Sequence, residues 1–179
     1  LVNALSEHAQ IESGVCVTAQ HREMLDQVLS LFEIIPQYDL NIMRPNQDLA
    51  HITQAVLLGV TEALAEFKPD RILIHGDTTT SFAAALAGFY QRIPVDHVEA
   101  GLRTGDIYAP FPEEMNRKLA DNLCDLHFAP TQTSANNLAL ENVASDSVII
   151  TGNTVIDALL SVVERIKTDA VLRSQMETQ

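Results

Sequence analysis

Short apolar segments alternate with longer amphipathic segments along this chain, and this alternation constrains the fold more than any other sequence feature. Several short runs are almost entirely apolar and rich in β-branched side chains, which is typical of buried strands. These runs cover residues 14–19, 71–75, 95–99, 126–129 and 147–151. Buried strands that alternate with helices predict a parallel sheet covered by helices on both faces. The expected fold class is therefore α/β, with a doubly wound parallel sheet.

The segments between these runs carry apolar residues three and four positions apart, which is the spacing of one helix face. Residues 49–67 show it most clearly, and Asp48 in front of them is a candidate N-cap. The other expected helices cover residues 21–32, 79–90, 113–123, 132–140 and 154–167. Residues 37–47 contain turn-forming side chains and are expected to be a connection without regular structure.

The composition excludes several classes of function. The 179 residues include 24 acidic and 11 basic side chains, for a formal net charge of −13. This acidity argues against binding to nucleic acid or to an anionic membrane surface, both of which require clustered Lys and Arg. The sequence has neither a signal peptide nor a run of 18 apolar residues, so we expect a cytoplasmic protein without a membrane span.

Common sequence signatures of cofactor, nucleotide and metal binding are missing. The chain has no G-x-G-x-x-G fingerprint, no P-loop, no G-x-S-x-G elbow and no Cys/His cluster with metal-ligand spacing. Cys16 and Cys124 lie among apolar residues and are expected to be buried free thiols. No metal or other cofactor is expected from these residues.

Polar side chains follow the expected strands at their carboxyl ends, where open parallel sheets bind ligands. Asp77 comes directly after Gly76 and before an expected helix. One interpretation is an N-cap whose carboxylate accepts from the backbone of Thr79 or Thr80; another is a carboxylate in the ligand crevice. The two are compatible. Thr78 and the hydroxyl residues after it add backbone N–H groups at a helix N-terminus, where an anion is favoured.

Two glutamates are further candidates for acid/base chemistry. Glu99 ends an apolar strand, where partial desolvation would raise its pKa and suit it to proton transfer. The alternative for Glu99 is an ion pair with Arg103 or Arg117. Glu113 opens an expected helix, where the helix dipole favours an acid even without a function.

Histidines within the strands have a simpler interpretation. His75 and His97 are expected to be core residues with satisfied hydrogen bonds rather than ligands. The residues alone therefore predict an α/β domain in which several carboxylates meet at one crevice. They indicate proton chemistry on a polar ligand, and they do not identify that ligand.

Five blocks of this sequence carry a resemblance to a known family. Three of them are His-Gly-Asp-Thr-Thr-Thr at 75–80, His-Val-Glu-Ala-Gly-Leu-Arg-Thr-Gly at 97–105 and Pro-Glu-Glu-Met-Asn-Arg at 112–117, and the other two cover residues 18–25 and 151–158. In this order, the blocks resemble the non-hydrolysing UDP-N-acetylglucosamine 2-epimerases. The resemblance covers essentially the whole chain and is greatest to the bacterial enzymes that supply UDP-N-acetylmannosamine for surface polysaccharides.

The resemblance implies a two-domain fold like that of the GT-B glycosyltransferases. Residues 1–153 would be a Rossmann-like N-terminal domain that lacks its first strand. Residues 154–179 would form a helix that leads toward the interdomain hinge, and the C-terminal domain would be absent. We therefore expect the isolated chain to bind UDP-sugars weakly and to turn over negligibly. A homodimer is expected by the same resemblance.

The family reaction inverts C2 of the sugar by elimination of UDP, followed by its re-addition. The resemblance assigns proton transfer to Asp77, Glu99 and Glu113, without fixing which acts on which face of the ring. It implies substrate-binding or supporting roles for Arg117, Thr78, Gln20 and Arg103. The expected partners are UDP-N-acetylglucosamine and UDP-N-acetylmannosamine, and no metal or redox cofactor is required.

Departures and alternatives accompany this assignment. Some family members are activated by a second UDP-N-acetylglucosamine. Gln20 matches the residue that those members carry at this position, but Glu23 and Asn46 do not match theirs, so activation is not expected here.

One alternative is a GT-B-type glycosyltransferase, which would need an acceptor. Another is a hydrolysing epimerase, which would release UDP. A third is a binding domain without catalysis, against which the retention of all three carboxylates argues.

Overall fold

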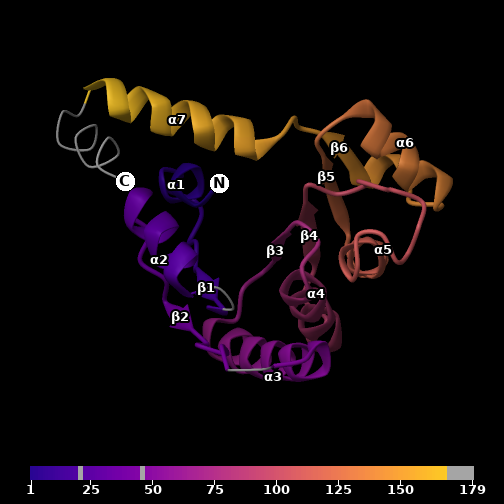
Figure 1. Cartoon of the computed structure of the whole chain (residues 1–179), viewed down its shortest axis with the longest axis horizontal. Helices are drawn as coiled ribbons and strands as arrows, with labels where there is room; N and C mark the ends of the chain where they lie inside the picture. The colour runs from indigo at the N-terminus through magenta and orange to yellow at the C-terminus, as the bar shows by residue number, and fades with distance from the viewer. Residues whose placement is uncertain (20–21, 45–46, 169–179) are drawn as a thin grey trace.

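The computed structural model describes residues 1–19, 22–44 and 47–168. The helices are α1 (Val2–Ser6), α2 (Arg22–Leu31), α3 (Leu49–Phe67), α4 (Thr79–Gln91), α5 (Glu113–Asp121), α6 (Gln132–Leu140), η1 (Ser145–Ser147) and α7 (Thr154–Thr168). The strands are β1 (Cys16–Val17), β2 (Tyr38–Asp39), β3 (Ile72–His75), β4 (Val95–Val98), β5 (Leu126–Ala129) and β6 (Val148–Ile150). The order of strands and helices confirms the expected α/β class (Figure 1).

The described strands are all parallel, but they form two sheets rather than the single sheet that we expected. One sheet has the order β3-β4-β5-β6, and the other pairs β1 with β2. Within the described ranges, no ladder joins β1 to β3. Strand β2 lies within residues 37–47, which were expected to be irregular. A strand of two residues is too short to show the period-two pattern on which sequence interpretation depends.

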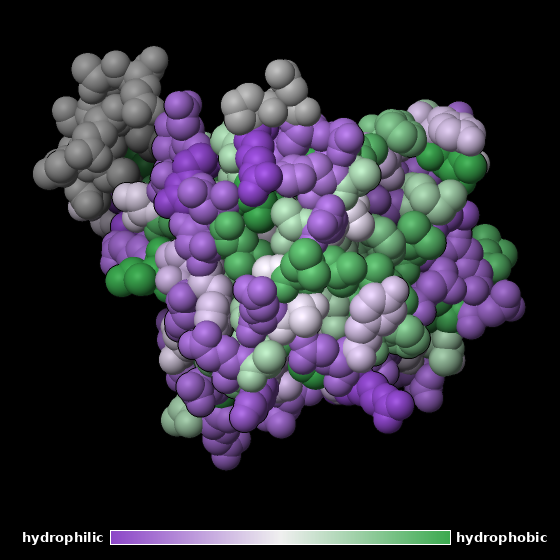
Figure 2. Space-filling view, turned by 90° about the horizontal axis from the view of Figure 1, so that it is seen from below, coloured by the Kyte–Doolittle hydropathy of each residue, from purple (hydrophilic) through white to green (hydrophobic). Residues whose placement is uncertain are grey.

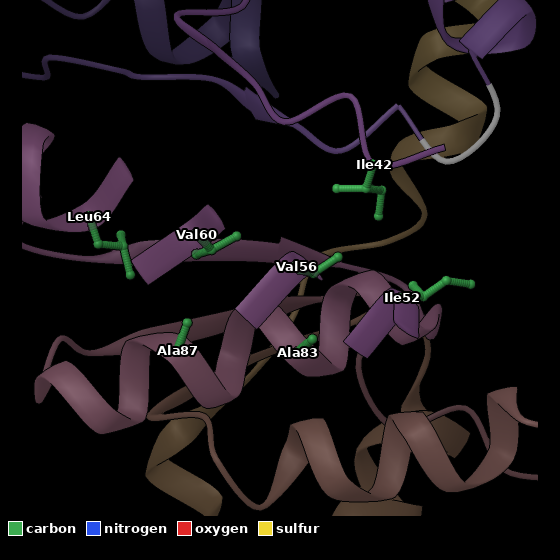
Figure 3. Close-up of a cluster of buried hydrophobic side chains, with 7 residues drawn as sticks. All are labelled: Ile42, Ile52, Val56, Val60, Leu64, Ala83 and Ala87. Atoms are coloured by element: carbon green, nitrogen blue, oxygen red, sulfur yellow. The ribbon is translucent and has the colours of Figure 1, made fainter. Parts of the chain in front are cut away.

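The main apolar core lies between helices α3 and α4 (Figure 3). Val56 and Val60 of α3 face Ala83 and Ala87 of α4, and Ile42 from the connection after β2 completes the cluster. Small alanines on α4 allow the two helix axes to approach closely. Ile42 thereby anchors the connection after β2 to helices α3 and α4.

Helix termini were partly predicted from the sequence. Asp48 caps α3 as expected, because its carboxylate accepts from the backbone N–H of His51 at 2.7 Å. Thr131 caps α6 in the same way through the N–H of Ser134. Both caps depend only on residues within one helical turn, so local sequence is sufficient to identify them.

The surface contains many exposed apolar side chains. Figure 2 shows apolar groups gathered toward the middle of the face seen from below. Helix α7 runs along the opposite side of the molecule in Figure 1, and none of its described residues is buried.

Cys16, expected to be buried, is exposed, and both cysteines are free thiols. Among the described residues, no helix has the length and apolar character that crossing a bilayer requires.

Candidate active site

The carboxyl ends of β3 and β4 lie side by side and carry two of the predicted acids. His75 of β3 is the register partner of Val98 of β4, so the residues that follow each strand are neighbours. Gly76 and Glu99 both have a φ of 71°. This left-handed conformation is rare for a residue other than glycine, and such residues concentrate at functional sites. A Cβ on Gly76 would lie 3.7 Å from Oε2 of Glu99, so the Glu99 carboxylate lies beside the turn that contains Asp77.

Glu99 contacts a histidine rather than the arginines considered from the sequence. Its Oε2 lies 3.3 Å from Nε2 of His75, and 26% of its side chain is exposed. Arg103 and Arg117 pair with other acids, so the alternative interpretation of Glu99, an ion pair with one of these arginines, is wrong. His75 was expected in the core, but 47% of its side chain is exposed. It is the last residue of β3, so it lies at the carboxyl edge of the sheet.

Asp77 is not the N-cap of α4. Thr78 takes that position, and its hydroxyl accepts from the backbone N–H of Ser81 at 3.3 Å. The Asp77 carboxylate instead accepts from Nη2 of Arg117 on α5. Its side chain remains 28% exposed. Asp77 therefore stays partly exposed at the carboxyl edge of the sheet, which is compatible with the alternative interpretation from the sequence.

Helix α5 presents two adjacent glutamates in opposite environments. Glu114 is fully buried and accepts from the backbone N–H groups of Thr104 and Gly105, each at 3.1 Å. It also accepts from Nη1 of Arg117 at 3.0 Å. Glu113 is partly buried, and no hydrogen bond of its carboxylate to a described residue is present. Glu113 is thus available for chemistry, whereas Glu114 holds the loop and the arginine in place.

Sequence reasoning missed the role of Glu114. Its only local signal is the doubled acid in Pro112-Glu113-Glu114, and the helix dipole explains both acids equally well. Helical geometry separates them, because adjacent side chains on a helix point in directions about 100° apart. Besides Arg117, the buried contacts of Glu114 come from the loop before α5, and sequence spacing does not place that loop.

Arg103 belongs to a network of charges beneath the site. Its guanidinium donates to Asp121 at 2.7 Å and to Glu141 at 3.0 and 2.7 Å, and Lys118 lies 2.9 Å from Glu141. Only 7% of the Arg103 side chain is exposed. Its donors are therefore occupied within the protein, which favours the supporting role over direct substrate contact. The other predicted contact, Gln20, lies outside the described residues.

The network also fixes the charge state of its acids. Burial raises the pKa of Asp121, but hydrogen bonds from His97 and Arg103 outweigh this effect and hold that pKa below its usual value. The hydrogen bond from Arg103 lowers the pKa of Glu141, with Lys118 adding to the effect. Both carboxylates are consequently ionised at neutral pH. His97 is fully buried as expected, and its ring contacts Asp121 and the Gly76 carbonyl.

The arrangement brings two carboxylates to one edge of the sheet and links a third to them through α5. Asp77 and Glu99 end adjacent strands, and Glu113 lies one helical turn before the arginine that binds Asp77. Such a set can remove and return protons on a ligand held at that edge. Within the described residues, no group of three His, Cys, Asp or Glu side chains is arranged to hold a metal ion.

Comparison with known proteins identifies close relatives. A family model described as UDP-N-acetylglucosamine 2-epimerase matches residues 3–179. The UDP-N-acetylglucosamine 2-epimerase of Escherichia coli (strain K12) is 61% identical over 176 residues, which are 98% of this chain and 47% of that protein. The enzyme of the same name from Salmonella typhimurium is 58% identical over 179 residues, all of this chain and 48% of that protein.

Solved structures agree with these matches. The Neisseria meningitidis UDP-GlcNAc 2-epimerase bound to UDP-GlcNAc superposes with a TM-score of 0.92 at 58% identity, over 99% of this chain and 48% of that one. The Methanocaldococcus jannaschii enzyme in complex with UDP-GlcNAc and UDP gives a TM-score of 0.89 at 32% identity, with the same coverage. The Rossmann-like, GT-B-related fold is confirmed. The chain spans about half the length of the curated relatives it matches.

Proposed function

Because the chain belongs to the UDP-N-acetylglucosamine 2-epimerase family, we propose that the whole protein containing it interconverts UDP-N-acetylglucosamine and UDP-N-acetylmannosamine. By the whole protein we mean a polypeptide of the relatives' length, of which this chain spans about half. The observation that carries the proposal is the match over residues 3–179 to this family. The product would supply surface polysaccharide synthesis.

The proposed reaction breaks and re-forms two bonds of the sugar. A carboxylate removes the C2 proton as the C1–O bond to UDP breaks, which leaves a 2-acetamidoglucal and free UDP in the site. A proton then returns to C2 on the opposite face, and a UDP oxygen adds back to C1. Atoms and charge balance without an oxidant or reductant, and the two faces of the ring require separate acid/base groups.

We assign these proton transfers to Asp77, Glu99 and Glu113. The exposure of Asp77 and Glu99 at adjacent strand ends supports the assignment, because a ligand at the crevice can reach both carboxylates. Arg117 would orient Asp77 through their ion pair. Backbone N–H groups at the start of α4, beside Thr78, would favour the negative charge of the departing UDP.

We also propose that a further strand of the whole protein fits between β1 and β3. Each of these strands has one edge without a ladder partner among the described residues. Leu73, in the middle of β3, is 45% exposed, which is unusual for the centre of a parallel sheet. In the proposed division, residues 1–153 form a Rossmann-like domain and residues 154–179 lead toward a second domain. A homodimer remains a prediction, which light scattering on the whole protein would test.

An isotope-exchange experiment tests the proposed reaction. The whole protein is incubated with UDP-N-acetylglucosamine in D2O, and C2 is followed by proton NMR. Deuterium at C2, with UDP-N-acetylmannosamine forming and little UDP accumulating, is the expected result. Stoichiometric UDP release would favour a hydrolysing epimerase instead. The absence of both deuterium exchange and UDP release would contradict the proposal. The remaining candidates would then be a glycosyltransferase that needs an acceptor or a binding domain without catalysis. The 179-residue chain run in parallel is expected to show negligible turnover.

A further inference from the structure

Each ring nitrogen of the buried His97 faces an oxygen that accepts hydrogen bonds. Nδ1 lies 2.5 Å from Oδ1 of Asp121, and Nε2 lies 2.8 Å from the carbonyl oxygen of Gly76. A backbone carbonyl has no proton to donate. Asp121 is ionised, since its other oxygen accepts from Nη2 of Arg103 at 2.7 Å. Both ring nitrogens must therefore carry a proton for both contacts to be hydrogen bonds.

We propose that His97 is a buried imidazolium that holds the Gly76–Asp77 turn in the orientation that presents the Asp77 carboxylate to substrate. His97 is then a positioning residue and not a general base, since its ring has no free lone pair. This inference rests on the proposed function, because it assigns a purpose to the orientation of Asp77. The protonation state of His97 can be measured independently of any activity.

The surroundings of His97 stabilise a positive charge. A buried cation is tolerated only when it is paired and hydrogen-bonded. Asp121 supplies the opposing charge and shares it with Arg103, while Glu141 pairs with Arg103 and with Lys118. Among the described residues, six titratable groups face the ring or its partners. They are Asp121 and Lys118 of α5, Arg103 of the loop before it, Cys124 after it, Glu141 at the end of α6 and His127 of β5, whose Nε2 contacts the Asp121 carbonyl. Three cations thus face two carboxylates, and the most exposed of the cations, Lys118, is partly solvated, with 33% of its side chain exposed.

The turn held by His97 is fixed from several directions. The N–H of Gly76 donates to the carbonyl of Val98 at 3.0 Å, and its carbonyl accepts from His97. The left-handed φ of 71° at Gly76 redirects the chain directly before Asp77. Arg117 then binds the Asp77 carboxylate. His97 therefore controls the backbone side of Asp77, while Arg117 controls its side chain.

His127 is a natural control within the same structure. It is the register partner of His97 on β5 and is almost as deeply buried. Its Nε2 donates to the backbone carbonyl of Asp121 at 2.9 Å, and no described residue provides a partner for its Nδ1. This pattern fits a neutral ring with one bare nitrogen. His127 does not contact Gly76 or Asp77.

The first test reads the ring nitrogens directly. The whole protein is labelled with 15N-histidine, and signals are assigned with His97→Gln and His127→Gln. At neutral pH, two protonated nitrogens are expected on His97 and one bare nitrogen on His127 in the same spectrum. A bare ring nitrogen on His97 at neutral pH would overturn the proposal. The state of the ring is read in the unsubstituted protein, and if His97→Gln does not fold, sequential backbone assignment of the unsubstituted protein identifies the His97 signals.

The second test separates positioning from packing. Misplacing a reacting group by about 1 Å can lower the rate about 100-fold. We expect His97→Gln to lower kcat by about 10- to 100-fold, with KM within about twofold, whereas His127→Gln keeps kcat within about twofold. Unchanged kcat in a folded His97→Gln variant, or equal losses in both variants, would contradict the positioning role. An unsubstituted protein without epimerase activity would contradict the proposed function alone, since the nitrogen signals still report the imidazolium.

Discussion

Arg117 on α5 donates to the carboxylate of Asp77, which lies 40 positions earlier at the end of β3. The other amino group of the same guanidinium donates to Glu114 at 3.0 Å. One buried arginine thus connects a candidate catalytic acid to the residue that anchors the loop at Thr104 and Gly105. The position of Asp77 consequently depends on how α5 packs against the strand ends.

Arg117→Lys is expected to lower kcat of the whole protein by about 10- to 100-fold. Lysine has a single ammonium group and cannot replace a planar guanidinium that donates to two acids at once. Steady-state kinetics measure the effect. Arg71→Lys is the matched control, because Arg71 donates to the buried Asp96 at 2.7 and 2.5 Å near the amino end of β4, away from the crevice. Equal losses in both variants would point to general destabilisation.

The adjacent glutamates of α5 are expected to respond differently to removal of their charge. Glu113→Gln should lower kcat about 100-fold or more and change the free energy of unfolding by less than about 0.5 kcal/mol. Glu114→Gln should lower the free energy of unfolding by about 2 kcal/mol, because it leaves buried donors poorly satisfied. Kinetics and urea unfolding of both variants give the comparison. A stable Glu114→Gln variant would contradict the anchoring role.

The depressed pKa of Asp121 predicts a loss of stability in acid. Its ordinary value is 3.8, and its pKa in the folded protein is lower, so the folded state holds fewer protons than the unfolded state as both titrate. The resulting stabilisation is complete above the unfolded pKa and is lost as pH falls through the folded pKa. Urea unfolding from about pH 6 down to pH 3 should show this decline.

Asp121→Asn provides the matched comparison for the acid decline. It should lower the free energy of unfolding by about 3 kcal/mol at neutral pH, since it leaves His97 without an ionised partner and removes one of the two carboxylates that pair with Arg103. It should also flatten the acid decline. The exposed Asp146, changed to Asn, should leave both the neutral stability and the decline unchanged. Identical acid slopes in the Asp121→Asn variant and the original protein would show that other groups cause the effect.

Gly101 and Gly105 have almost the same φ but different surroundings. Replacing each with alanine therefore distinguishes the cost of a steric clash from the cost of a left-handed backbone. Gly101 (φ 83°) lies where a Cβ would approach the carbonyl oxygen of Ser134 to 2.3 Å, whereas a Cβ on Gly105 (φ 84°) would meet nothing within 4 Å. Gly105→Ala should therefore cost about 1 kcal/mol for the left-handed backbone alone. Gly101→Ala should cost at least about 2 kcal/mol more, because α6 must shift. Thermal unfolding of the two variants measures the difference, and equal costs would contradict the steric explanation.

The sequence by itself determined the features that depend on neighbours along the chain. The apolar spacing in residues 49–67 predicted α3 with the bounds that it has, and Asp48 was correctly identified as its cap. Buried strands in alternation with helices predicted the parallel α/β class. The sequence blocks also led to the correct family. Each of these features follows from local hydrogen bonds, side-chain periodicity or sequence similarity.

Only the tertiary structure decided which charges meet and where the sheet is interrupted. Asp77 was a plausible cap by spacing, but Thr78 caps α4 and Asp77 pairs with Arg117 of a distant helix. Glu99 contacts His75 at the end of the adjacent strand, and it pairs with neither Arg103 nor Arg117. The division into two sheets likewise reflects which strand edges lie within reach of each other. Such contacts depend on how separate elements are oriented in space, and a one-dimensional pattern carries no measure of that orientation.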